Sequence, residues 1–504
     1  MSAVEQSTAV PGPPTGQGPP AVQPLKAGSV GLVGVVFMAL ATAAPITAMT
    51  GNLPVIIGSG NGLHAPAGFL FVTLVLTVFT VGYVAMARHI TTAGAFYGFV
   101  SHGLGRVAGM ASGLLAVLAY VVFEASIVGI FAYFAQQTVE AQFGVHWPWQ
   151  VFALAMLAVT ALLSYFDLEV AAKVLGVFLV GEVLMLGLLA TAVLVHGGGP
   201  GGLRVGSLNP TGAFAGVNAG VGLFFCFWSW IGFESTAMYG EESRNPRRII
   251  PRATLIAVIG LGVLYTFVAW MVVAGNGAKA LDVAGGSNPL DLFLVPARQY
   301  LGPWAATAFQ WLMCTSAFAC GMAFHQCAAR YLYAIGREGF LPRALGRTHP
   351  RHGSPYVASF TQTAIALAVV GGFWAAGQDP YASLYTLTAI LGTLALLVVQ
   401  TLCSFAVIGY FRRNHPESRH WFRTFTAPLL GGLGMIAAIV LLVANLDTAA
   451  GAASKILFFK LIPWIVGAVL VAGVALALHM RARHPQKYEL LGRLIVADTQ
   501  ERDA

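Results

Sequence analysis

The chain has 504 residues, of which 57% are hydrophobic and 9% are charged, and its mean hydropathy is +0.75. Soluble domains carry roughly 25% charged residues, so this composition excludes a protein with a fully water-exposed surface. The net charge of +8 does not indicate a nucleic-acid partner. The basic residues lie between apolar runs, where such residues contact lipid headgroups and set the topology.

Apolar runs of about 18 residues or more recur along the chain, and a run of this length crosses the roughly 30 Å hydrocarbon layer as one helix. We therefore predict an all-α integral membrane protein with twelve transmembrane helices rather than a barrel of short alternating strands. The predicted spans are residues 30–57, 66–88, 103–136, 149–166, 170–196, 212–240, 251–274, 303–336, 356–376, 382–411, 427–446 and 457–480.

The two ends of the chain differ in composition from the spans. Residues 1–26 are rich in Pro, Gly, Gln and Ser, which predicts a disordered cytoplasmic tail. No basic region precedes a short apolar core, so this segment does not read as a signal peptide. The polar residues 481–504 predict a cytoplasmic C-terminal tail. Residues 27–480 are then the predicted twelve-helix membrane domain.

Lysine and arginine indicate the orientation, because cytoplasmic loops carry an excess of them. We place five of the 27 in exterior loops or at their margins, and the others on the opposite side or in the tails. Both termini are then expected in the cytoplasm, which agrees with an even number of spans in a multi-pass protein of the cytoplasmic membrane. The five exterior residues are Arg204, Lys279, Arg298, Lys455 and Lys460.

The first and sixth predicted spans contain helix-breaking residues near their middles. Pro45 lies within the first, in the stretch TAAPIT at 42–47, and Gly232 lies within the sixth, in WSWIGFES at 228–235. Proline removes a backbone donor, and glycine lowers helix propensity. Two interrupted helices five spans apart are typical of an inverted repeat whose half-helix ends face a substrate at the bilayer midplane. The competing interpretation is that Pro and Gly are simply common in membrane helices.

Two long polar strings follow the sixth and eighth spans. The first is EESRNPRRIIPRA at 241–253, and the second is RYLYAIGREGFLP at 330–342, followed by PRHGSPY at 350–356. Together with GFES at 232–235, these strings resemble the cytoplasmic signatures of the amino acid–polyamine–organocation (APC) permease family. The resemblance covers about residues 30–480.

The resemblance implies a LeuT-like fold of two inverted repeats of five spans, about residues 30–196 and 212–411, with two extra C-terminal helices at about 427–446 and 457–480. It places the substrate between the interrupted parts of spans one and six. There, N–H groups at a half-helix N-terminus face the carboxylate of an amino acid, and carbonyls of span six face its amine. The implied substrate-binding residues are Ala43, Ala44, Pro45, Ile46, Thr47, Trp228, Ile231, Gly232 and Phe233.

The chain departs from the family in span one. Members that bind α-amino acids often carry a Gly-Ser-Gly type stretch where this chain has TAAPIT, and Pro45 offers no backbone donor. This difference leaves room for amine substrates. Span six is similar to that of the family's arginine/agmatine antiporters, which implies that Trp228 closes over the substrate and that Glu234 takes part in proton-linked control. The competing interpretation of Trp228 is a packing or interface aromatic.

Three carboxylates lie inside predicted spans, namely Glu124, Glu182 and Glu234. Insertion scales assign roughly 2.5–3.5 kcal/mol to an acidic residue at a helix centre, so each needs a reason to be there. We interpret them as candidates for proton or ion coupling; the alternative is a protonated or hydrogen-bonded carboxyl that holds helices together. Glu182 stands where several amino acid transporters of the family carry a lysine, so the lysine-based account of coupling does not transfer.

Other polar residues in the spans are weaker candidates. His325 can titrate near neutral pH, but a lone histidine among small apolar residues usually packs helices together. Tyr120 and Tyr385 are candidates to reach the central cavity as hydroxyl donors. Cys320 and Cys327 lie on the same predicted helix as His325 without a ligand spacing, so we expect no metal site.

We therefore predict a secondary active transporter, a permease that moves an amino acid across the cytoplasmic membrane by alternating access, in proton-coupled symport or exchange. A polyamine or other amine is the alternative substrate, and a transport-inactive sensor or a channel on the same scaffold is the alternative of another class. The expected partners are a small-molecule substrate, a coupling ion and the lipid bilayer. The sequence has no Walker loop, which argues against an ATP-driven pump, and it has no zinc spacing or nucleophile elbow that would indicate an enzyme. We expect no cofactor.

Overall fold

The apolar runs form helices, because inside a bilayer every backbone N–H and C=O must be bonded within the protein. A computed structural model describes residues 30–90, 95–165, 168–240, 243–349 and 354–489, and these residues form helices and turns without a β-sheet. The α-helices in chain order are α1 (Leu32–Ala43), α2 (Pro45–Ser59), α3 (Ala65–Ala87), α4 (Phe96–Leu104), α5 (Arg106–Phe143), α6 (Trp149–Tyr165), α7 (Leu168–Val195), α8 (Ala219–Trp230), α9 (Pro246–Asn276), α10 (Ala280–Ala284), α11 (Asp291–Leu301), α12 (Pro303–Arg337), α13 (Tyr356–Ala375), α14 (Thr386–Arg413), α15 (Ala427–Ala444), α16 (Leu446–Ala450), α17 (Leu457–Arg483) and α18 (Pro485–Glu489).

Short 3₁₀ and π-helical turns connect or extend these helices. Two of them matter for the site: η4, a 3₁₀ helix that follows α8, and η7, a π-helical turn that leads into α14. The short turns are η1 (Gly62–His64), η2 (Val205–Leu208), η3 (Pro210–Phe214), η4 (Phe233–Tyr239), η5 (Gly277–Lys279), η6 (Arg343–Gly346), η7 (Pro380–Tyr385), η8 (Pro416–Ser418), η9 (Trp421–Thr426) and η10 (Gly451–Lys455).

Within the described residues, nine helical segments are long and apolar enough to cross a membrane. The first of them combines α1 and α2. Three of the twelve predicted spans correspond to helices outside this set. The predicted span 149–166 is α6, which has 17 residues; the span 212–240 is divided between α8 and η4; and the span 303–336 is α12. The chain is thus a multi-pass membrane protein, and the number twelve stays a prediction.

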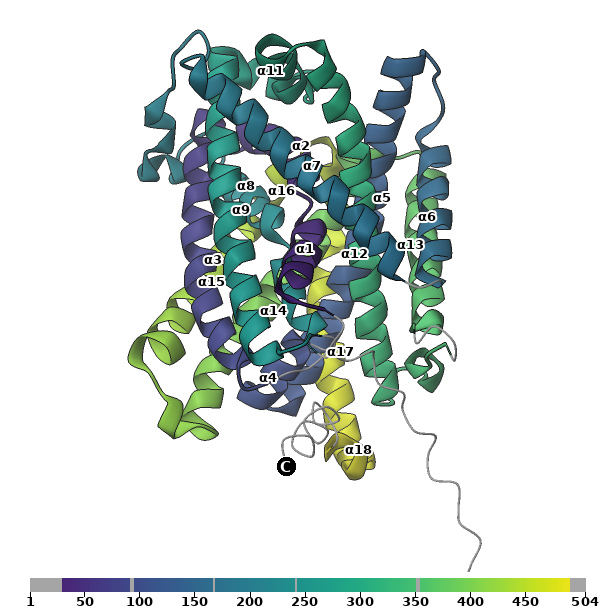
Figure 1. Ribbon diagram of the computed structural model, residues 1–504. Helices are drawn as coiled ribbons and strands as arrows, with labels where there is room; N and C mark the ends of the chain where they lie inside the picture. The colour runs from purple at the N-terminus through teal and green to yellow at the C-terminus, as the bar shows by residue number, and fades with distance from the viewer. Residues whose placement is uncertain (1–29, 91–94, 166–167, 241–242, 350–353, 490–504) are drawn as a thin grey trace, which may run out of the picture.

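The long helices differ in how much of their surface other helices cover. The most apolar stretches of α5 and of the η7–α14 segment are each 78% buried, whereas that of α17 is 22% buried. In Figure 1 the long helices run side by side between an end that carries α11 and an end that carries α18. α5 and α14 therefore form the interior of the bundle, and α17 presents exposed side chains such as Trp464 and Val471 to lipid.

Some predicted boundaries moved or lie outside the described residues. α17 continues to Arg483 and α18 follows it, so helix extends into the predicted tail 481–504. The predicted tail 1–26, the end of the chain after residue 489, and residues 241–242 and 350–353 of the two signature strings lie outside the described residues.

Candidate substrate site at two broken helices

The first predicted span is broken, as expected, between α1 and α2. Ala44 separates the two helices with φ 44° and ψ 76°, in the left-handed region that costs a residue with a Cβ about 1–2 kcal/mol. Pro45 then opens α2 as its first residue, a position where the missing N–H removes no intrahelical bond. The break thus lies one residue before the proline that signals it in the sequence.

The sixth predicted span is broken between α8 and η4. α8 ends at Trp230, and Gly232 has φ 119° and ψ −23° before η4 begins at Phe233. A Cβ on Gly232 would lie 2.8 Å from backbone atoms of Thr42 and Ala43 and from the Cβ of Thr42. The two breaks are therefore in direct contact, and only glycine fits both the backbone conformation and the gap.

A small cavity lies between the two breaks. Its volume is about 20 Å³, close to the space that one water molecule needs, and every residue that lines it is buried. The conformation is therefore one in which the site is closed. The cavity is lined by Thr42, Ala43, Ala44, Thr47, Ala48, Asn52, Ile127, Trp228, Ile231, Cys320, Phe324 and Tyr385.

The nine residues expected to bind substrate divide into two groups. Ala43, Ala44, Thr47, Trp228 and Ile231 line the cavity. The other four hold the breaks in shape or pack behind them, and they are Pro45, Ile46, Gly232 and Phe233. Whether any of the nine binds substrate stays a proposal.

Sequence reasoning missed several residues that line the cavity. Asn52 is four residues after Ala48 on α2, and Phe324 is four residues after Cys320 on α12, so each pair lies on one helix face. A polar Asn52 within an apolar span was a signal that could have been used. Ile127 and Phe324 carry no such signal, because they look like ordinary core residues.

Trp228 is held by a chain of hydrogen bonds on the α2 and α8 side of the cavity. Its Nε1 donates to Tyr385 Oη at 2.8 Å, and Tyr385 Oη donates to Asn52 Oδ1 at 2.6 Å. Asn52 Nδ2 in turn donates to Ser229 Oγ at 2.8 Å. These hydrogen bonds, which we call the Trp228 latch, connect α2, α8 and η7. Tyr385 thus reaches the cavity, but its hydroxyl hydrogen is donated to Asn52.

Glu234 lies on the opposite side of the break, at the start of η4. Its Oε1 accepts a hydrogen bond of 2.7 Å from Tyr120 on α5, and its Oε2 accepts one of 3.0 Å from the backbone N–H of Gly232. The backbone carbonyl of Glu234 accepts a further bond from Tyr83 on α3. The side chain is fully buried, and it ties the conformation of the break to α5.

Glu182, on α7, lies against the first turn of α2. Its Oε2 accepts a hydrogen bond of 2.6 Å from Ser316 on α12 and a longer one of 3.4 Å from the backbone N–H of Ile46. α7 crosses the bundle obliquely in Figure 1 and contacts both α1 and α2. Glu182 is 1% exposed, and the hydrogen bonds to its side chain come from one hydroxyl group and one backbone N–H.

Glu124 belongs to a different polar cluster, behind the cavity wall. Its carboxylate oxygens lie 3.0 and 3.1 Å from Nδ1 of His325, and Gln362 on α13 donates to Oε2 at 2.7 Å. Nε2 of His325 is 2.8 Å from Ser359 Oγ. Sequence reasoning considered Glu124 and His325 separately; the structure joins them into one buried pair that connects α5, α12 and α13.

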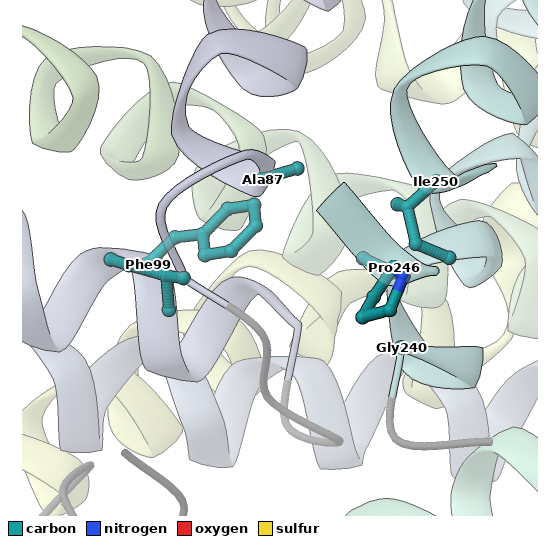
Figure 2. Close-up of a pocket in the computed structure, with 7 residues that line it drawn as sticks. Ala87, Phe99, Gly240, Pro246 and Ile250 are labelled. Atoms are coloured by element: carbon teal, nitrogen blue, oxygen red, sulfur yellow. The ribbon is translucent and has the colours of Figure 1, made fainter. Parts of the chain in front are cut away.

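A second cavity, of about 10 Å³, lies near the other end of η4 (Figure 2). Phe99, Pro246 and Ile250 contribute apolar side chains, and Gly240 contributes only backbone. Its lining carries no charged or hydroxyl side chain. It therefore has fewer hydrogen-bonding groups for a substrate amino group or carboxylate than the cavity between the breaks has.

Gly232→Ala tests the contact between the breaks. We expect loss of transport and a lower melting temperature, because the added Cβ collides with α1 and because φ 119° costs about 1–2 kcal/mol for a residue with a side chain. Gly260→Ala on α9 is the matched control, since nothing lies within 4 Å of its Cβ position. Equal transport by the two variants in proteoliposomes would contradict the proposed role of the contact.

Glu124→Ala tests whether the buried pair is structural. Removing the carboxylate leaves Nδ1 of His325 without its hydrogen-bond partner in the bilayer interior, which we expect to destabilise the protein by about 3–5 kcal/mol. The double variant Glu124→Leu/His325→Leu removes both polar groups, so its loss of unfolding free energy should be much smaller than the sum of the two single losses. If the double variant is stable but no longer uses a proton gradient, the pair has a coupling role instead.

The chain was compared with known protein families and curated proteins. Residues 30–471 match the amino acid permease family model. The chain is 24% identical over 422 residues to the branched-chain amino acid permease BcaP of Bacillus subtilis (strain 168), covering 79% of this chain and 83% of the relative. It is 24% identical over 415 residues to the low-affinity putrescine importer PlaP of Escherichia coli (strain K12), covering 80% of this chain and 86% of the relative. The chain therefore belongs to the amino acid permease family of the APC superfamily, which confirms the resemblance seen in its sequence motifs.

Proposed function

We propose that this chain is a secondary active transporter that moves an amino acid, or a related amine, across the cytoplasmic membrane by alternating access, as a proton-coupled symporter or exchanger. The observation that carries the proposal is the closed cavity between two helix breaks that contact each other. Half-helix ends at mid-membrane are a recurring way for transporters to offer backbone groups to a substrate. Membership of the family and its transporter relatives support the same proposal.

We also propose the twelve-span topology and the LeuT-like repeats. The nine candidate spans together with α6, the α8–η4 segment and α12 make up the twelve predicted crossings. The breaks after α1 and after α8 then occupy equivalent places in two repeats of five spans, α1 to α7 and α8 to α14, with α15 and α17 as the extra helices. The distribution of lysine and arginine supports cytoplasmic termini in a plasma-membrane protein.

Alternating access requires a separate gate on each side of the cavity. The Trp228 latch closes the α2 and α8 side, and the bond between Tyr120 and Glu234 holds the η4 side. Glu234 accepts a hydrogen bond from the backbone N–H of Gly232. A change in the protonation of Glu234 would therefore alter a hydrogen bond at the helix break itself. We therefore propose Glu234 as the first candidate for proton coupling, with Glu182 and Glu124 as the other two.

The first measurement is uptake of radiolabelled amino acids and amines into proteoliposomes, with and without an inward proton gradient. One pH unit stores about 1.4 kcal/mol, which supports about tenfold accumulation for each proton that is coupled. Glu234→Gln keeps acceptor and donor atoms near Tyr120 and Gly232 but cannot exchange a proton. We expect this variant to lose gradient-driven accumulation and to keep exchange of labelled for unlabelled substrate.

Glu140→Gln, an exposed residue on α5, is the control and should accumulate substrate as the wild type does. Accumulation by Glu234→Gln equal to that of the wild type would remove Glu234 from the coupling mechanism. If no compound accumulates or exchanges with folded wild-type protein, the alternative of a transport-inactive sensor replaces the proposed function.

A further inference from the structure

The backbone donors at the N-terminus of α2 are already taken by the protein. The first residue, Pro45, has no N–H. The N–H of Ile46 donates to Glu182 Oε2 at 3.4 Å, the N–H of Thr47 donates to Ser316 Oγ at 3.4 Å, and that of Ala48 donates to Ala44 O at 2.8 Å. All of these positions belong to the described chain, and none of them has an N–H left for a ligand.

The group that takes the first available donor is a carboxylate. A helix N-terminus attracts anions because its free N–H groups and the helix dipole present partial positive charge there. Glu182 places a carboxyl group there from α7, and a chain of hydroxyls holds it in position. Ser316 Oγ donates to Glu182 at 2.6 Å and accepts from Thr47 Oγ1 at 2.9 Å. Thr47 itself lines the cavity, so the carboxylate lies one layer of side chains behind the cavity wall.

The cavity provides no positively charged side chain to pair with the carboxylate of a substrate. None of the twelve described residues that line it is charged, and the carboxylates of Glu182 and Glu234 lie behind its two sides. An unpaired substrate anion in a low-dielectric interior is strongly unfavourable.

A cation finds the opposite conditions in the same cavity. α8 ends at Trp230, and the last carbonyls of a helix carry partial negative charge, although the carbonyl of Trp228 already accepts a hydrogen bond from the Ile231 N–H. Trp228, Phe324 and Tyr385 contribute aromatic rings to the lining, and the face of such a ring attracts an ammonium group.

We infer that Glu182 is a specificity-determining residue: it occupies the place at the α2 N-terminus that a substrate carboxylate would need, so that the cavity selects amines without an α-carboxylate. This inference rests on the proposed transporter function and narrows its substrate class to organic ammonium compounds. The apolar and aromatic lining suits an amine with a compact hydrocarbon part. Entry requires the Trp228 latch to open, since the closed cavity holds only about 20 Å³.

The test compares pairs of compounds that differ only by the α-carboxylate. The pairs are isobutylamine with valine, isopentylamine with leucine, putrescine with ornithine, and agmatine with arginine. Binding to the purified full-length protein is measured by calorimetry, and uptake is measured in proteoliposomes. We expect the amine of at least one pair to bind at least about tenfold more tightly than its amino acid, a difference of about 1.4 kcal/mol.

Glu182→Ala frees the Ile46 N–H and removes the carboxyl group that occupies the start of α2. We expect amine binding to weaken about tenfold or more and the preference within the pair to shift toward the amino acid. Glu182→Gln keeps an oxygen near Ile46 but not the charge, so it separates occupancy of the site from electrostatic attraction. Glu140→Gln is the matched control for the loss of a carboxylate, and its preference should equal that of the wild type. Circular dichroism and gel filtration establish that each variant is folded.

The outcomes distinguish this inference from the proposed function. If amino acids bind and are transported better than their amines, Glu182 does not exclude carboxylates, and the transporter proposal stands without this refinement. If Glu182→Ala keeps the wild-type preference for amines, the selection resides elsewhere and the role of Glu182 is overturned. If folded wild-type protein neither binds nor transports any member of the four pairs, the inference fails, and the wider uptake panel decides the proposed function.

Discussion

The contact between the two helix breaks is the constraint on which the rest of the site depends. A break exposes backbone N–H and C=O groups, and the bilayer interior provides no water to satisfy them. Ala44 and Gly232 adopt positive φ angles in the middle of two predicted spans, and the two breaks lie in direct contact. The free backbone groups on either side are then bonded by polar side chains from neighbouring helices.

Two of the buried carboxyl groups bind backbone N–H groups that the helix breaks leave free. Glu182 accepts a hydrogen bond from the Ile46 N–H at the start of α2, and Glu234 accepts one from the Gly232 N–H at the other break. Each is anchored by a hydroxyl group from a different helix, Ser316 on α12 and Tyr120 on α5. Both glutamates thus connect a break to the surrounding helices, which is the arrangement that a transporter needs if protonation or substrate binding is to move one part of the bundle against another. Glu124 differs, because its partners hold α5, α12 and α13 together away from the breaks.

The family to which the chain belongs does not by itself decide the substrate. Two relatives of similar identity are named for a branched-chain amino acid and for putrescine, and the chain covers most of both. What distinguishes these substrate classes physically is the carboxylate. A substrate carboxylate and Glu182 would compete for the same N–H groups at the start of α2.

The sequence by itself determined that this is a helical membrane protein of the APC superfamily, and it marked Pro45 and Gly232 as sites of interruption. These properties follow from composition, from the length of apolar runs and from local backbone chemistry, which need no knowledge of neighbours. Only the tertiary structure decided which residues face the cavity, because successive residues of a helix point about 100° apart and the rotation of each helix is set by its packing. Pro45 and Ile46 were therefore expected in the lining but lie behind it, while Asn52 and Phe324 were missed. The side-chain partners of the three glutamates also come from helices more than 100 residues away in sequence, and such pairings are decided by the packed fold rather than by any local pattern.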